Sequence, residues 1–146
     1  KKAFEKAINN SNKVAMSLSD LFCVERHKND FLDLVKNKLD ITFANEQEIL
    51  ALLNTESLQE VISFTKQIKK HIVITRGANG SMVIKNEKVF EYPAKSNLKI
   101  VDLTGAGDLF AAGYLHGFIN NLSVEESLKH GTILSSKVIQ TIGARL

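Results

Sequence analysis

The alternation of short apolar runs with amphipathic segments is the feature that most constrains the fold of this chain. Runs rich in β-branched and apolar residues are typical of buried strands, and they occupy 13–18, 40–45 and 71–77. Apolar residues at helical spacing indicate helices, and they occupy 1–10, 29–38, 46–53 and 58–69. Strands that alternate with helices predict an α/β layered fold, in which a mostly parallel sheet is flanked by helices.

The second half of the chain adds a hairpin and two helices to this pattern. Two short apolar runs flank Asn86-Glu87 and predict a β-hairpin. The segment 109–119 is apolar nearly all round, which predicts a buried helix. Ser123 and Glu126 have the spacing of a capping box, so we expect a last helix over 124–140.

Length, charge and composition limit the classes of function. With 146 residues, of which 44% are hydrophobic, the chain suits one globular domain over 1–146. Its net charge of +3 comes from lysines scattered among acids, without an aromatic stripe. We therefore expect a solvated surface and no nucleic-acid partner. A mildly basic chain still suits a small anionic ligand.

The cysteine and histidine content gives expectations about compartment and metals. Cys23 is the single cysteine, so no disulfide forms within the chain, and a cytoplasmic location is expected. We expect Cys23 to be a small buried residue, and His71 to lie at a surface or sheet edge. No histidine has the spacing of zinc ligands. No apolar run is long enough to span a bilayer, so no membrane partner is expected.

The segment "TGAGD", Thr104–Asp108, carries the strongest chemical signal. Gly105, Ala106 and Gly107 are small enough for backbone amides to approach a ligand closely, and amides at a helix start bind anions. The pattern is neither a Walker A loop nor a dinucleotide fingerprint. The alternative is a small-residue turn followed by a favourable first-turn acid. From these residues alone, both interpretations remain equally open.

Asp108 determines what an anion site at this loop would do. A carboxylate repels a phosphate bound at the same amides, so it makes no sense as a phosphate ligand. As a base, it accepts a proton from an attacking hydroxyl while the amides stabilise charge on the transferred group. Phosphoryl transfer depends mostly on positioning and charge neutralisation, so one acid beside an anion hole suffices.

Several polar residues directly follow predicted strands, namely Asp20, Asn45, 75–77 and the Gly105 loop. In open α/β sheets, ligands bind beyond the carboxyl ends of the strands, so we expect these residues to converge on one rim. Gly113 and Gly117 lie in the helix after the loop. They indicate close backbone packing, with close ligand approach as the alternative.

The segment "DLTGAGD", Asp102–Asp108, resembles the C-terminal signature of the ribokinase/PfkB family of small-molecule kinases. Two further family features occur in the family's order, "NEQE" at Asn45–Glu48 and "TRGANG" at Thr75–Gly80. The resemblance covers nearly the whole chain and implies a ribokinase-like fold. The segments "SLSDLFCVERH", "ITFANEQEILALL" and "IGARL" are most similar to the bacterial adenosine-kinase-like branch.

The resemblance implies a role for each matching residue. Asp108 is the expected catalytic base, with the Gly105–Gly107 loop as its anion hole. Glu48, with Asn45, is expected to organise the water shell of Mg²⁺ beside the ATP phosphates. The other residues expected to bind the nucleotide are Thr75, Arg76, Gly77, Gly80 and His116. The alternatives are an Arg76 that points to solvent and a His116 that packs within the protein.

The resemblance also implies a monovalent-cation site. Asp102 and Thr104, with Gly143 and Ala144, are expected to shape a site for an ion such as K⁺, although family members vary there. Leu103 stands where the signature usually has threonine.

The activity implied is ATP-dependent transfer of the γ-phosphoryl group to a hydroxyl of a small-molecule substrate. Adenosine is favoured, and a ribose-like or fructose-like sugar is the alternative. A non-catalytic nucleotide-binding module is a further alternative, which the retention of Asp108 and Glu48 disfavours. Family members are longer, and their N-terminal half carries the β-lid and most acceptor contacts. Residues 1–146 therefore match the ATP-binding and catalytic portion, and a homodimer through the absent lid region stays open.

Overall fold

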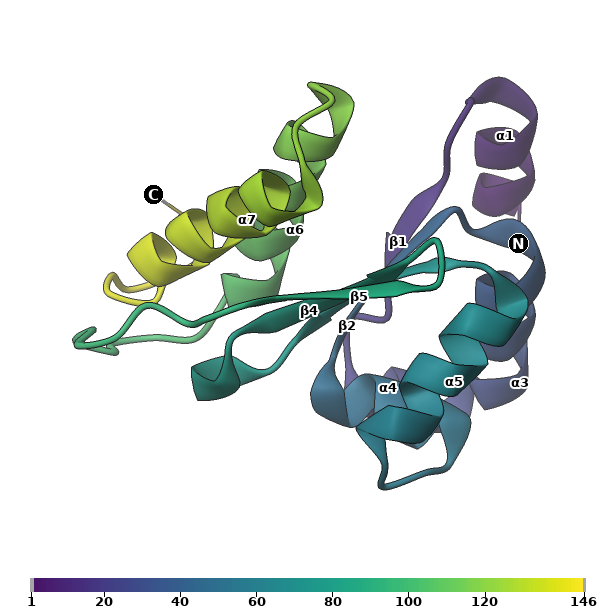
Figure 1. Cartoon of the computed structure of the whole chain (residues 1–146), viewed down its shortest axis with the longest axis horizontal. Coiled ribbons are helices and arrows are strands. Elements are labelled where there is room, and N and C mark those ends of the chain that lie inside the picture. Colours follow the sequence, from purple (N-terminus) through teal and green to yellow (C-terminus); the bar gives the residue numbers. More distant parts are fainter. Residues whose placement is uncertain (1, 146) are drawn as a thin grey trace. The chain divides into compact units, whose positions relative to one another are not determined.

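The computed structural model of the chain describes residues 2–145, with side chains from Glu5 to Arg145. Lys1, where the predicted first helix begins, and Leu146, which ends "IGARL", lie outside the described residues. None of the described helices is both long and apolar enough to cross a bilayer. The elements, most of which are labelled in Figure 1, are α1 (Lys2–Asn10), β1 (Ala15–Ser17), α2 (Leu21–Arg26), α3 (Lys28–Asp33), the π-helical turn η1 (Leu34–Lys38), β2 (Ile41–Asn45), α4 (Glu46–Leu53), α5 (Leu58–Ile68), β3 (His71–Thr75), the 3₁₀ turn η2 (Gly77–Asn79), β4 (Ser81–Lys85), β5 (Lys88–Tyr92), α6 (Ala106–Ile119) and α7 (Val124–Val138).

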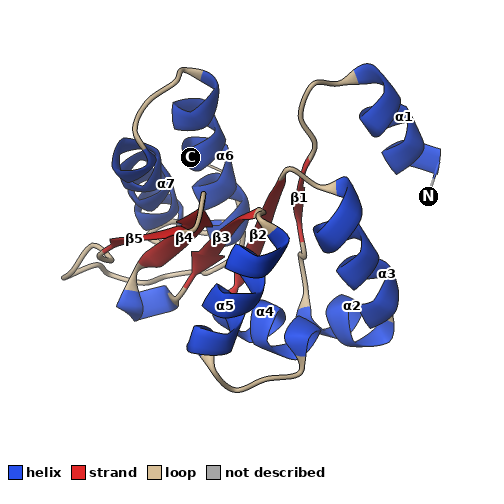
Figure 2. Cartoon of the chain, turned by 45° about the vertical axis from the view of Figure 1, so that its right-hand side comes forward, coloured by secondary structure: helices blue, strands red, loops and turns tan. Residues whose placement is uncertain are grey.

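The five strands form one sheet in the order β1-β2-β3-β4-β5 (Figure 2). Strands β1 and β2 are parallel, with Ala15 opposite Ile41. Strands β4 and β5 meet at Asn86 and Glu87, whose φ angles of 50° and 63° are left-handed, as tight hairpin turns require. The sheet is therefore mixed and flanked by helices, and the predicted α/β class and hairpin are confirmed.

The chain divides into two compact units, and the first contains the residues up to Ile74 together with Ile84–Val89. Its core is built on β2 and β3, each of which has an unbroken run of four buried residues. Such runs are typical of parallel strands covered on both faces. Helix α4 contacts β2 and the helices α2, α3 and α5. Its Ile49 and Leu52 are fully buried, so α4 closes this core.

The second unit contains Thr75–Val83 and the chain from Phe90 onward. Within it, α6 and α7 run side by side (Figure 1). A Cβ added at Gly113 would lie 2.6 Å from the His130 carbonyl oxygen, and one at Gly117 would lie 2.5 Å from Ser127 Oγ. The two helix backbones are too close for any larger side chain at these positions. The packing interpretation of both glycines is confirmed.

The segment between β1 and β2 contains one more helix than predicted. The helix predicted over 29–38 is confirmed as α3 followed directly by the π-helical turn η1, and the unpredicted short helix α2 precedes it. Asp20 begins α2, because its Oδ1 accepts a hydrogen bond from the amide of Phe22 at 2.6 Å. The apolar pattern does not reveal α2, since Val24 is its one buried residue.

Two single-residue expectations are wrong. Cys23 is exposed, because it lies on the solvent side of the short helix α2. His71 is buried, with 7% of its surface exposed. It begins β3, which is the central strand of the sheet and so has no free edge.

Candidate active site

Asn45 and Glu48 form a capping box where β2 passes into α4, in the first unit. Asn45 Oδ1 accepts a hydrogen bond from the Glu48 amide at 2.8 Å, and Glu48 Oε2 accepts one from the Asn45 amide at 2.9 Å. Asn45 Nδ2 also donates to Glu48 Oε1 at 2.8 Å. These contacts fix the carboxylate at the end of a buried strand.

Glu48 is buried, with 5% of the residue's surface exposed, and its surroundings shift the pKa of its carboxyl group. Burial raises the pKa of Glu48, the bond from the Asn45 amide opposes that rise, and the negative charge of Asp20 adds to it. Asp20 and Glu48 therefore lie within electrostatic reach of each other. The parallel strands β1 and β2 bring them to the same edge of the first unit.

The loop before α6 turns at Gly105, whose φ of 79° is left-handed. A Cβ there would lie 2.7 Å from the Ala144 Cβ, so the loop packs against the C-terminal segment. Helix α6 begins at Ala106, earlier than predicted, and Asp108 lies exposed in its first turn. The Ala106 amide donates to the Leu103 carbonyl oxygen at 3.2 Å. The Ala106 amide is therefore already paired within the loop, and the anion-hole role of the loop stays a prediction.

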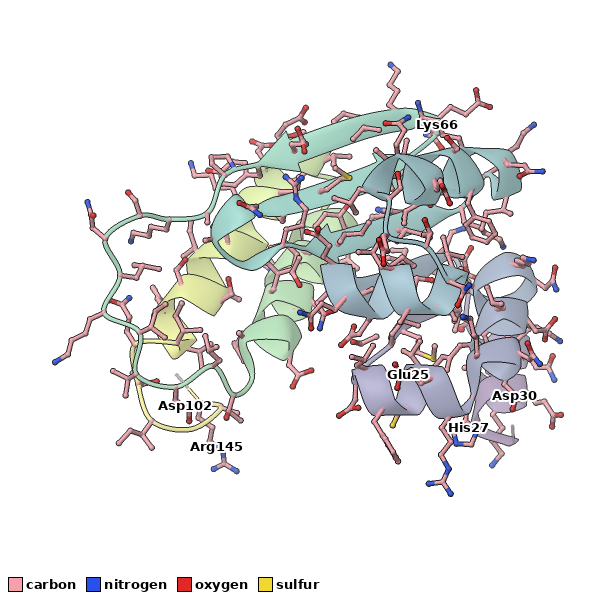
Figure 3. The ribbon with its side chains drawn as sticks, turned by 90° about the horizontal axis from the view of Figure 1, so that it is seen from below. Glu25, His27, Asp30, Lys66, Asp102 and Arg145 are labelled. Atoms are coloured by element: carbon pink, nitrogen blue, oxygen red, sulfur yellow. The ribbon has the colours of Figure 1, made fainter. Side chains whose placement is uncertain are left out.

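Asp102 ties this loop to the C-terminal segment. Its Oδ1 accepts hydrogen bonds from the Thr104 amide at 2.9 Å and from Thr104 Oγ1 at 2.7 Å. Its Oδ2 accepts one from the Gly143 amide at 2.9 Å. The Thr104 amide bond, the Thr104 hydroxyl bond and the Gly143 bond, in that order, lower the pKa of Asp102. Figure 3 shows Asp102 beside the segment that carries Arg145.

The "TRGANG" segment forms a tight turn between β3 and β4. Gly77 and Gly80 have left-handed φ angles of 56° and 83°. The Arg76 amide donates to the Gly80 carbonyl oxygen at 2.8 Å and closes the turn. A Cβ at Gly80 would collide with the Tyr92 carbonyl oxygen. The turn thus depends on glycine for its backbone angles at Gly77 and also for close packing at Gly80.

The Arg76 guanidinium is held inside this turn. Its Nη2 donates to the Asn79 carbonyl oxygen at 3.1 Å and forms an ion pair with Glu91 Oε1 at 2.9 Å. The side chain is 15% exposed. The alternative that Arg76 points to solvent is therefore wrong, while its role toward phosphate stays a prediction.

A cavity of about 690 Å³ lies within the second unit. Thr75, Gly77 and Gly80 from the turn, and Ala106 and Gly107 from the first turn of α6, belong to its wall. The other lining residues are mostly small, hydroxyl-bearing or apolar: Ala78, Ser81, Ala94, Lys95, Ser96, Asn97, Leu98, Ile100, Leu103, Phe110, Thr132, Ser135, Ser136 and Ile139. The turn predicted to bind nucleotide and part of the predicted anion hole thus meet at one cavity.

The remaining predicted site residues lie elsewhere. Gly105, Arg76, Asp108 and His116 are not among the residues that line this cavity. The His116 ring lies edge-on to that of His130 on α7, with 5.5 Å between the centroids, and the residue is exposed. Its predicted nucleotide contact stays a prediction.

Sequence reasoning missed the contribution of α7 to the cavity. Thr132, Ser135 and Ser136 line it from one face of α7, and Ile139, the residue that caps the end of this helix, continues the same spacing of three and four residues. Thr132 and Ser136 are buried hydroxyl residues. Small hydroxyl residues on an otherwise apolar helix face are the signal that would have revealed this wall.

Comparison with known proteins identifies the family. The pattern of the pfkB family carbohydrate kinases matches residues 1–146. Adenosine kinase 2 of Arabidopsis thaliana is 31% identical over 95% of this chain and 44% of its own length. The 2-dehydro-3-deoxygluconokinase of Escherichia coli K12 is 36% identical over 72% of this chain and 35% of its own length.

Solved structures of similar proteins share the fold. The adenosine kinase from Sinorhizobium meliloti superposes with a TM-score of 0.92 and 38% identity, covering 99% of this chain and 45% of that one. A probable sugar kinase from Rhizobium etli gives a TM-score of 0.91 and 37% identity, covering 99% and 44%. The fold is thus that of a ribokinase-like kinase. This chain belongs to the pfkB family of carbohydrate kinases, and it spans less than half the length of the relatives it matches.

Proposed function

We propose that this chain carries the nucleotide-binding and catalytic part of an ATP-dependent kinase that phosphorylates a hydroxyl of a small molecule. The observation that carries this proposal is the shared cavity wall. The "TRGANG" turn and the first turn of α6 are separate segments, yet both line one cavity in the second unit. A helix N-terminus and a glycine turn are suited to anionic groups, because both present backbone amides.

Asp108 is proposed as the base. Its exposed carboxylate can accept the proton of an acceptor hydroxyl as that oxygen forms its bond to the γ-phosphorus. The bond between the γ-phosphorus and the bridging oxygen breaks, and ADP leaves with the negative charge. The amides of Gly105 and Gly107 are proposed to stabilise charge on the transferred group.

Mg²⁺ is the expected partner of the phosphates, and the residues present fit it. Each oxygen of Glu48 accepts a hydrogen bond from Asn45 and keeps a further lone pair for a metal-bound water. Among the described residues, no three His, Cys, Asp or Glu side chains gather to hold a metal. Mg²⁺ in phosphoryl-transfer sites is generally held by one or two carboxylates together with water and substrate phosphates. When bound, Mg²⁺ would neutralise phosphate charge. A K⁺ site at Asp102 and Thr104 stays a prediction.

The acceptor is proposed to be a nucleoside, with adenosine favoured over a sugar. Support comes from the adenosine kinases of S. meliloti and A. thaliana, which match nearly the whole chain. The sugar alternative is supported by the Rhizobium etli protein, at almost the same similarity. A screen of adenosine, other nucleosides, ribose and fructose with ATP and Mg²⁺, on the complete protein, separates the two.

Replacing Asp108 by asparagine tests the proposed base. We expect Asp108→Asn in the complete protein to abolish phosphate transfer, because an amide cannot accept the proton. ATP affinity, measured by calorimetry, should stay close to that of the wild type. Full activity in the variant would exclude Asp108 as the base. Normal ATP affinity of the wild type without turnover on any acceptor would instead indicate a non-catalytic nucleotide-binding module.

A further inference from the structure

Two buried polar atoms at the "TRGANG" turn have no hydrogen-bond partners. Within the described part of the chain, Arg76 Nε and Ser81 Oγ are buried and make no hydrogen bond. Arg76 lies in the turn, directly before η2, and Ser81 follows the turn at the start of β4. Leaving a buried polar group unpaired is costly, so each such group in a folded protein requires an explanation.

Ser81 is the more informative of the two, because it belongs to the cavity wall. The residue is 1% exposed and lines the cavity described above. Its neighbours in the wall include Gly77 and Gly80, which carry no side chains. A serine hydroxyl moves between three staggered positions about one bond. Such a rotation can turn the hydroxyl of Ser81 from the protein toward a ligand in the cavity.

The two unpaired atoms share one chemical property, which points to the kind of ligand. Arg76 Nε is a donor only, and a serine hydroxyl can always donate. Nη2 of the Arg76 guanidinium is held by Asn79 and by its ion pair with Glu91, so Nε remains the unpaired donor of that group. Unpaired donors are suited to a hydrogen-bond acceptor, and charged phosphate oxygens are strong acceptors.

We propose that Ser81 binds the nucleotide, with its hydroxyl donating a hydrogen bond to a phosphate oxygen. The proposal rests on the proposed function, because it requires a nucleotide in the cavity. It adds a residue outside the glycine turn and the α6 loop. In the free protein, the unpaired Ser81 hydroxyl lowers the stability of the folded state. A bound nucleotide offsets this loss, because its phosphate oxygen accepts the missing hydrogen bond.

The variant Ser81→Ala of the complete protein tests this role with two readouts. We expect its affinity for ADP, measured by calorimetry, to fall about ten- to a hundredfold, the range of a hydrogen bond to a charged group. The thermal midpoint of the nucleotide-free protein should stay the same or rise, because the change removes an unpaired buried hydroxyl. A hydroxyl with a purely structural role would give the opposite result, a lower midpoint with unchanged ADP affinity.

Ser127→Ala is the matched control. Ser127 is also buried, at 2% exposed, but its hydroxyl donates to the Ser123 carbonyl oxygen at 2.9 Å and it does not line the cavity. This variant should lower the thermal midpoint and leave ADP affinity within about twofold, since it removes a satisfied hydrogen bond away from the cavity.

Inorganic pyrophosphate separates a phosphate contact from a nucleoside contact. If Ser81 binds phosphate, Ser81→Ala should weaken pyrophosphate and ADP to a similar degree. Weaker ADP with unchanged pyrophosphate would overturn the phosphate assignment. Unchanged ADP affinity in the variant would overturn the role of Ser81 and leave the kinase proposal standing. A wild-type protein that binds neither ADP nor ATP would overturn both.

Discussion

At the scale of single residues, His71 shows how position in the sheet controls chemistry. The side chain is buried at the start of the central strand, beside the charge of Lys85. Burial, followed by the positive charge of Lys85, lowers the pKa of His71 from 6.5 to about 4. The folded protein therefore holds this imidazole neutral at a pH where the unfolded chain would protonate it.

The consequence is a pH-dependent stability. Between pH 6.5 and about 4, the unfolded chain binds a proton at His71 that the folded chain does not. Stability is complete above that window and falls as the pH drops through it, by up to about 3 kcal/mol. Urea unfolding at pH 7 and pH 5 should show this loss, and His71→Leu should reduce it. An identical loss in the variant would contradict the assignment.

At the scale of elements, the close pair α6 and α7 determines how the first turn of α6 is supported. Gly113, Gly117 and Gly131 each lie against the backbone or a side chain of the opposite helix. Helix α6 carries Ala106, Gly107 and Phe110 into the cavity wall, and α7 supplies the hydroxyl face. The shape of that wall therefore depends on the distance between the two helix axes.

The variant Gly113→Ala tests this dependence. Because the added methyl group would lie 2.6 Å from the His130 carbonyl oxygen, the helices must separate, and we expect a loss of about 2 kcal/mol in the free energy of unfolding. Gly107→Ala is the matched control, since nothing lies within 4 Å of its added Cβ. Its free energy of unfolding should stay the same or rise by up to about 1 kcal/mol, as alanine favours the helix. Equal losses in both variants would contradict the packing argument.

The elements that the sequence predicts are those whose pattern is local. The capping box at Ser123 and the hairpin turn at Asn86-Glu87 are confirmed, because a few neighbouring residues specify each one. Helix α2 escapes prediction, since it is short and mostly exposed. The face of α7 that lines the cavity with hydroxyl residues, and the buried hydroxyl of Ser81, could not be predicted either. Their environment is made by residues distant in the sequence, which no local pattern records.

At the scale of the whole chain, Asp102 links two segments that are far apart in sequence. Asp102 itself lies in the loop before α6. One oxygen of its carboxylate accepts hydrogen bonds from Thr104 in the same loop, and the other accepts one from Gly143 in the C-terminal segment. The hydrogen bonds that lower the pKa of Asp102 are stronger when it is ionised. The link is therefore complete above the usual pKa of an aspartate and is lost as the pH falls through the lowered value.

Hydrogen exchange can measure this link directly. In Asp102→Ala, the amides of Thr104 and Gly143 should both exchange faster than in the wild type, because each loses its acceptor. Thr104→Val is the control, since it removes the hydroxyl bond and leaves both amide bonds. The Gly143 amide should keep its protection in that variant. Unchanged exchange at Gly143 in Asp102→Ala would show that the segment is held by other contacts.

The contact between Gly80 and the Tyr92 carbonyl oxygen has a consequence for how sequences of this kind can vary. No side chain fits at Gly80, because the carbonyl oxygen of Tyr92, the last residue of β5, occupies the space that its Cβ would need. The length of each hairpin strand is thereby set, since an insertion or deletion within either strand would bring a different carbonyl to that place. Length changes should be tolerated at the exposed tip, Asn86-Glu87, where both residues face solvent. A graft, label or loop exchange in this part of the protein therefore belongs at the tip.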